Sequence, residues 1–130
     1  MSTVLIVDDY PSVRKTLRSL LEERLCSVVC IEASNGLDAI AMAQESSPDL
    51  IILDLGMPGM NGFEAATVLQ NAKPQVPLFM FTSHDSREVE SQAAAVGILA
   101  VFSKYTGINA LLARATELLN TPRALAAQQV

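Results

Sequence analysis

Cysteine is scarce in this 130-residue chain, which contains only Cys26 and Cys30. If the two lie four residues apart along a strand, their Cα atoms are about 13 Å apart, well beyond the reach of a disulfide. A metal site built on thiolates would need further Cys or His residues nearby, and the sequence has none there. We therefore expect two buried thiols in a reducing compartment.

Positive charge is also scarce. The chain has 9 Lys and Arg residues against 14 Asp and Glu residues, which gives a formal net charge of −5. An acidic domain repels phosphate backbones, so we expect no direct binding to DNA or RNA. Apolar residues make up 50% of the chain and charged residues 18%, a balance that predicts a folded core rather than disorder.

Long apolar runs are absent as well. The longest runs are the size of strands, far short of the roughly 20 residues that a membrane-spanning helix needs. No basic region or cleavage site precedes the first run, so we expect a cytoplasmic protein without membrane insertion. The length suits one domain, which we expect at residues 1–120, with 121–130 as a tail or the start of a linker.

Short apolar runs alternate with segments of helical periodicity, which predicts an α/β fold. Most runs are nearly continuous, as in strands that are covered on both faces, and five repeats imply a parallel sheet with right-handed crossovers. In the second helix, Leu37, Ile40 and Ala41 are expected to face inward. The predicted strands are 3–7, 28–31, 50–53, 78–81 and 98–102, and the predicted helices lie at about 11–25, 35–45, 61–71, 86–96 and 108–119.

Polar side chains follow four of the predicted strands: Asp8 and Asp9 the first, Asp54 the third, Thr82 the fourth and Lys104 the fifth. In a parallel sheet these ends meet at one edge, where ligands bind. Each pair of carboxylates at ~4 Å would repel by about 4 kcal/mol at an effective dielectric near 20. Because Lys104 leaves the cluster negative, we expect a divalent cation, and an all-oxygen site with few ligands favours Mg²⁺.

A carboxylate beside Mg²⁺, a lysine and a hydroxyl can accept a phosphoryl group, because this chemistry needs positioning and charge neutralisation. Asp54 would be the nucleophile and would form an acyl phosphate. Mg²⁺ would bridge Asp9, Asp54 and a phosphoryl oxygen, with Asp8 acting mostly through water. Lys104 and Thr82 would contact the remaining phosphoryl oxygens.

Over about residues 3–119 the sequence resembles the response-regulator receiver family. The resemblance implies a flavodoxin-like, doubly wound sheet of five parallel strands in the order 2-1-3-4-5 with five helices. The motifs that carry it are Val7-Asp8-Asp9-Tyr10-Pro11 with Arg14, Asp54-Leu55-Gly56-Met57-Pro58 with Gly62, Thr82-Ser83, and Gly97 with Lys104.

The resemblance also implies specific roles in two-component signalling. Asp54 is the expected phosphoacceptor, Asp8 and Asp9 the acidic pair, and the backbone carbonyl of Gly56 a further Mg²⁺ ligand. Thr82 is the expected switch hydroxyl and Lys104 the phosphate-pairing lysine. The expected partners are a histidine kinase or phosphotransfer protein and an unknown downstream protein. Such a domain is not an enzyme beyond its own phosphorylation and dephosphorylation.

Three departures from the family pattern stand out. Proline usually follows the lysine in a cis bond, but Tyr105 stands here, and a cis bond before it would cost about 2.5–4 kcal/mol, so trans is expected. Val101 replaces the aromatic switch residue, which puts the usual coupling to Thr82 in doubt. Gly56 and His84 stand at positions that border the path of the hydrolytic water; His84 could orient water or be a plain exposed loop residue.

Several alternatives remain open. The chain could be a stand-alone receiver or a fragment of a longer, DNA-binding regulator. A magnesium-dependent phosphatase with an aspartyl intermediate would need a second acidic residue two positions after Asp54, where Gly56 stands. A pseudo-receiver that binds without phosphorylation is disfavoured by the complete acidic set.

Overall fold

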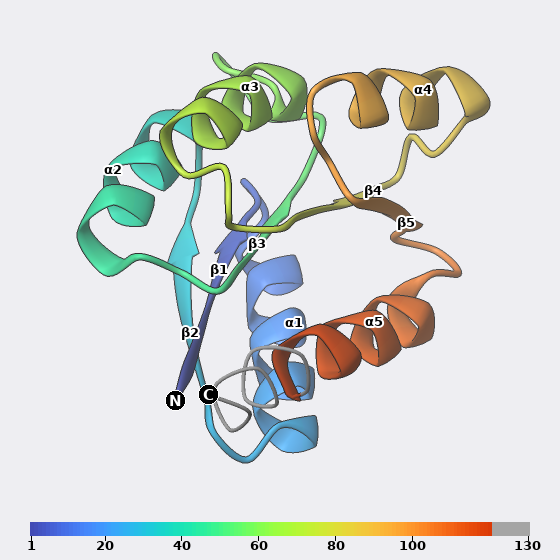
Figure 1. Cartoon of the computed structure of the whole chain (residues 1–130). Helices are drawn as coiled ribbons and strands as arrows, with labels where there is room; N and C mark the ends of the chain where they lie inside the picture. The colour runs from blue at the N-terminus through green and yellow to red at the C-terminus, as the bar shows by residue number, and fades with distance from the viewer. Residues whose placement is uncertain (121–130) are drawn as a thin grey trace.

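A computed structural model describes residues 1–120; the expected tail at 121–130 lies outside the described residues. The chain alternates strictly between strands and helices (Figure 1). The elements are β1 Ser2–Val7, α1 Pro11–Arg24, β2 Val28–Ala33, α2 Gly36–Ser46, β3 Leu50–Leu53, α3 Gly62–Ala72, β4 Leu78–Thr82, α4 Arg87–Ala95, β5 Ala100–Ser103 and α5 Ile108–Asn120.

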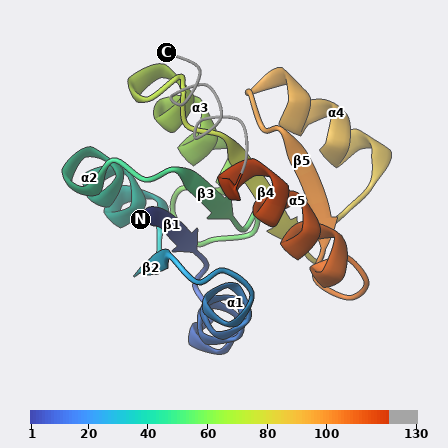
Figure 2. The same ribbon diagram turned by 60° about the horizontal axis from the view of Figure 1, so that its bottom comes forward.

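The five strands form one parallel sheet in the order β2-β1-β3-β4-β5. Helices α2, α3 and α4 cover one face of the sheet, and α1 and α5 cover the other (Figures 1 and 2). This confirms the predicted doubly wound fold. The chain adds β2 on one side of β1 and then crosses to add β3 on the other side, so the strand order reverses between β1 and β3. The carboxyl ends of β1 and β3 lie side by side at this switch point.

Alternation along the strands divides the core in two. Leu5 and Val7 of β1 pack under α2, α3 and α4, whereas Val4 and Ile6 pack under α1 and α5. The same alternation holds in β3 and β4, where every residue is buried. A strand that is buried on both faces is apolar at nearly every position, which explains the continuous runs in the sequence; Thr82, the last residue of β4, is the polar exception.

The inner face of α2 differs from the prediction. Leu37 is 70% exposed and Ala41 is also exposed, whereas Ala39 and Ala43 are buried and Ile40 only partly so. Small residues let α2 lie close to its neighbours: a Cβ added at Gly36 would stand 2.8 Å from the sulfur of Met60. Because α2 lies close to its neighbours, its small side chains face the core and Leu37 is exposed to solvent.

The two cysteines also differ from the prediction in one respect. Cys30 is buried in β2, and burial above all raises the pKa of its thiol to about 11. Cys26 is exposed, because β2 begins only at Val28 and Cys26 lies in the turn before it. The two thiols are not joined, as expected.

Helix α5 ends at the edge of the sheet that is opposite to the carboxyl ends of the strands. Leu119 and Asn120 line a shared cavity with Met1 and with Ser2, the first residue of β1. None of the helices within residues 1–120 is long and apolar enough to cross a membrane.

Candidate functional site

The three predicted carboxylates meet at the carboxyl edge of the sheet. Asp8, Asp9 and Asp54 each offer an oxygen, and these oxygens all lie within 4.8 Å of one another. The backbone sets this proximity, because Asp54 follows β3 and donates its N–H to the carbonyl of Val7 at the end of β1, at 2.9 Å. Asp8 and Asp54 are only 2% and 4% exposed, so these two carboxylates are sheltered from water, whereas Asp9 is partly exposed.

Lys104 reaches the cluster from the end of β5. Its Nζ lies 2.7 Å from Oδ2 of Asp8 and 3.4 Å from Oδ2 of Asp54. Burial alone would lower the pKa of Lys104, but the hydrogen bond to Asp8 and the charges of Asp54 and Asp8 outweigh it and raise that pKa. Lys104 is therefore an ammonium ion that bridges two carboxylates.

The pKa of Asp8 is raised above its ordinary value. Burial is the main cause, and the charge of Asp54 adds to it, while hydrogen bonds from Lys104 and from the N–H of Tyr10 act in the opposite direction. The lysine thus compensates only part of the cost of collecting the carboxylates. The site remains short of positive charge, as the sequence predicted.

Asp9 carries the clearest sign of an incomplete site. Its Oδ1 is buried and has no hydrogen-bond partner among the described residues. A buried carboxylate oxygen without a partner is costly, and carboxylate oxygens are the ligands that Mg²⁺ prefers. The donor set of Asp8, Asp9 and Asp54 therefore fits a hard divalent cation.

The remaining predicted residues surround the cluster at the ends of β3 and β4. Thr82 is fully buried, and its Oγ1 accepts the N–H of His84 at 3.1 Å. Gly56 is exposed in the loop after Asp54, and the exposed His84 places its ring beside it: a Cβ added at Gly56 would lie 3.9 Å from the imidazole. The loops after β3 and β4 are thus neighbours above the site.

Tyr10 was not among the predicted site residues. Its N–H donates to Oδ1 of Asp8 at 2.9 Å, and its ring centroid lies 5.5 Å from Nζ of Lys104, at a cation–π distance. Its position directly after the acidic pair could have marked it as a site residue. The direction of its ring, however, depends on the path of the chain between β1 and α1, which the sequence does not give. Tyr10 is 59% exposed, so it forms part of the rim of the site.

A tight turn after β5 directs Lys104. The buried hydroxyl of Ser103 accepts the N–H of Tyr105 at 3.1 Å and that of Thr106 at 3.4 Å, and the Gly107 N–H donates to the Ser103 carbonyl at 2.8 Å. No cis peptide bond occurs within residues 1–120, which confirms the expected trans bond before Tyr105. Val101, where the resemblance implies an aromatic residue, is partly buried against the core beneath α2, α3 and α4.

This turn predicts that a proline directly after Lys104 would destabilise this chain. Proline at position 105 has no N–H to donate to Ser103, so Tyr105→Pro should lower the free energy of unfolding by about 1 kcal/mol. Urea unfolding followed by circular dichroism measures this, with Tyr105→Ala, which keeps the N–H, as the control. Equal or greater stability of the proline variant would contradict the role given to the Ser103 turn.

Comparison with known proteins agrees with this geometry. A family model for the response regulator receiver domain matches residues 4–116. The chain belongs to this family. Receiver domains are modules of two-component signalling. The chemotaxis protein CheY4 of Vibrio cholerae is 30% identical, with a TM-score of 0.82 over 92% of this chain and 99% of that one.

Other relatives place receiver domains in longer proteins. The transcriptional activator protein ExaE of Pseudomonas putida is 34% identical over 78% of this chain and 47% of its own length. A protein-glutamate methylesterase/protein-glutamine glutaminase of Methanospirillum hungatei is 36% identical over 80% of this chain and 30% of its own length. The receiver domain spans about half the length of the first curated relatives that it matches.

Proposed function

We propose that this receiver domain accepts a phosphoryl group on Asp54 with the help of Mg²⁺, as a switch in two-component signalling. The observation that supports this most is the cluster of Asp8, Asp9 and Asp54 with Lys104 at the carboxyl edge of the sheet. The cluster combines a sheltered nucleophile, ligands for a hard cation and a fixed positive charge, which are the parts that phosphoryl transfer requires.

The residues available for Mg²⁺ are the carboxylates of Asp8, Asp9 and Asp54 and the backbone carbonyl of Gly56. The partnerless Oδ1 of Asp9 supports this assignment, because a cation would supply the missing contact. When bound, Mg²⁺ would neutralise negative charge on the phosphoryl oxygens.

The transfer step uses the chain's own groups. A carboxylate oxygen of Asp54 attacks phosphorus and forms a new O–P bond, while the bond from phosphorus to the donor breaks and the donor leaves with its electron pair. Lys104, already 3.4 Å from Oδ2 of Asp54, would exchange part of its contact with the carboxylates for a phosphoryl oxygen. The Thr82 hydroxyl accepts a hydrogen bond from His84 and keeps its own O–H to donate to another phosphoryl oxygen.

The proposed partners are a histidine kinase or a phosphotransfer protein as donor, and a downstream protein that distinguishes the two states. The domain is proposed to occupy residues 1–120. We propose the cytoplasm as its setting, in line with the expectation from the sequence. The lengths of the relatives also support a second possibility, a receiver that belongs to a longer DNA-binding regulator.

The experiment that tests the proposal uses acetyl phosphate as a small donor. Incubation with acetyl phosphate and Mg²⁺ should raise the intact mass by one phosphoryl group, with acetate as the leaving group. The same incubation in EDTA should give no adduct, because the carboxylates of Asp8, Asp9 and Asp54 then lack the cation. Failure to form the adduct, or equal formation in EDTA, would contradict the proposed chemistry.

A further inference from the structure

Arg14 connects α1 to the peptide bond between the two acidic residues. Its Nη1 donates to the backbone carbonyl of Asp8 at 2.7 Å, and its Nε donates to Oε1 of Glu32 on β2 at 2.8 Å. The guanidinium therefore ties the end of β1 to the end of β2. The side chains of Arg14 and Glu32 are mostly buried, at 16% and 26% exposed.

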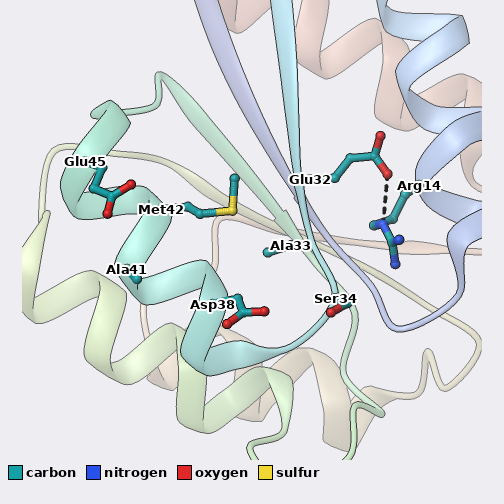
Figure 3. A pocket seen from close by; sticks show the side chains of 8 residues that line it. All are labelled: Arg14, Glu32, Ala33, Ser34, Asp38, Ala41, Met42 and Glu45. Carbon is teal, nitrogen blue, oxygen red and sulfur yellow. Dashed lines mark hydrogen bonds and ion pairs between the residues drawn. The ribbon is translucent and has the colours of Figure 1, made fainter.

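Close packing does not hold this guanidinium on all sides. Figure 3 shows Arg14 and Glu32 facing each other at a cavity of about 310 Å³ between α1, β2 and α2. Since one side of Arg14 borders this cavity, its position depends on the hydrogen bonds to Glu32 and Asp8. Arg18, one turn further along α1, makes a second ion pair with Glu32 at 3.2 Å and donates to the Cys30 carbonyl.

The carbonyl of Asp8 can influence Asp9 because it belongs to the peptide unit that joins the two residues. A peptide unit is planar, so a hydrogen bond that fixes the carbonyl oxygen also fixes the direction in which the chain enters Asp9. Oδ1 of Asp9 has no hydrogen-bond partner among the described residues, so little besides the backbone aims it. Repulsion from Asp8 and Asp54 would otherwise turn this carboxylate away from the cluster.

We propose that Arg14 is a positioning residue for the cation site. By donating to both the Asp8 carbonyl and Glu32, it fixes the peptide unit that leads to Asp9 and so keeps the Asp9 carboxylate in place before a cation binds. This inference rests on the proposed Mg²⁺ site. Groups behind the ligands commonly set metal affinity in this way. Arginine suits the task because its planar fork donates in two fixed directions at once, which a lysine ammonium does not.

Arg14 and Arg18 make a matched pair for the test. Each carries one positive charge on α1 and pairs with Glu32. Arg14 also donates to the carbonyl of Asp8, whereas Arg18 donates to the carbonyl of Cys30, so of these two arginines only Arg14 contacts the acidic pair. Removal of either charge makes the surroundings more negative, which by electrostatics alone would strengthen the binding of a divalent cation. Loss of positioning acts in the opposite direction, so the sign of the change separates the two effects.

The experiment is calorimetric titration of Mg²⁺ into the metal-free full chain and its variants, with thermal unfolding measured in parallel. Arg14→Ala should bind Mg²⁺ about tenfold more weakly than the wild type. Arg14→Lys, which keeps the charge, should also bind more weakly. Arg18→Ala should bind at least as tightly as the wild type, even where it unfolds at a lower temperature.

Wild-type affinity in both Arg14 variants would overturn the inference while leaving the proposed function intact. Equal weakening in Arg18→Ala would also overturn it, because a general loss of stability would then be the cause. If Arg14→Ala does not fold, Arg14→Lys decides the matter. Absence of Mg²⁺ binding by the wild type would instead contradict the proposed function itself, and this inference with it.

Discussion

Asp54→Ala is expected to take up no phosphoryl group from acetyl phosphate and Mg²⁺ under conditions in which the wild type is fully modified. Alanine has no oxygen to form the acyl phosphate, so the loss should be complete rather than partial. Intact-mass spectrometry measures it. The substitution also removes one of three crowded carboxylates, so the variant should remain folded and its circular dichroism should match the wild type.

The matched control for this loss is Asp85→Ala. Asp85 is an exposed carboxylate in the loop after β4, at the same edge of the sheet, but it does not belong to the cluster. This variant should be modified like the wild type. Borohydride reduction of the wild-type adduct, followed by peptide mapping, should locate the acyl phosphate at Asp54; an adduct that persists in Asp54→Ala would place the acceptor elsewhere.

Gly62→Ala is expected to lower the stability of the fold strongly, and much more than Gly56→Ala. Gly62 begins α3, and its N–H donates to the Leu55 carbonyl at 2.8 Å. A Cβ added there would stand 2.9 Å from Cα of Leu55 and closer still to the carbonyl oxygen of Asp54. Both neighbours are backbone atoms that cannot rotate away, so the free energy of unfolding should fall by about 3 kcal/mol.

Thermal unfolding checks this expectation, with a decrease of roughly 10 °C in the midpoint for a domain of this size. Gly56→Ala is the control for stability, because a Cβ at Gly56 would find its nearest contacts at 3.9 Å. Its midpoint should stay within a few degrees of the wild type, since surface changes usually cost little. Equal midpoints for the two variants would contradict the close approach of α3 to the backbone of Asp54.

The sheet was predictable because its strands are buried on both faces. The run at 28–31 marked β2 but stopped short of Ala33, because Glu32 interrupts the apolar pattern; Glu32 stays in the strand by pairing with Arg14 and Arg18. The inward face of α2 was not predictable from hydropathy, which ranks leucine above alanine. The short distance between packed elements decided that face, and this distance is a property of the assembled fold.

The cluster was predictable because parallel strands carry their carboxyl ends to a common edge, and Asp8, Asp9, Asp54 and Lys104 all follow strands. Residues that act through side-chain direction were harder to find. The Tyr10 ring could have pointed away from Lys104 with the same sequence spacing. The bridge that Arg14 makes depends on the rotation of α1 against β2, which periodicity does not fix.

The end of α5 beside the first residues of β1 has a consequence for any signal that this domain passes on. Asn120 lies near Ser2, at the edge of the sheet remote from Asp54, and the six residues of β1 span about 20 Å. A segment attached beyond Asn120 therefore starts about the length of β1 away from Asp54, too far to contact that carboxylate at its first residue. Helix α5 covers that distance, since it begins four residues after Lys104 and ends at Asn120.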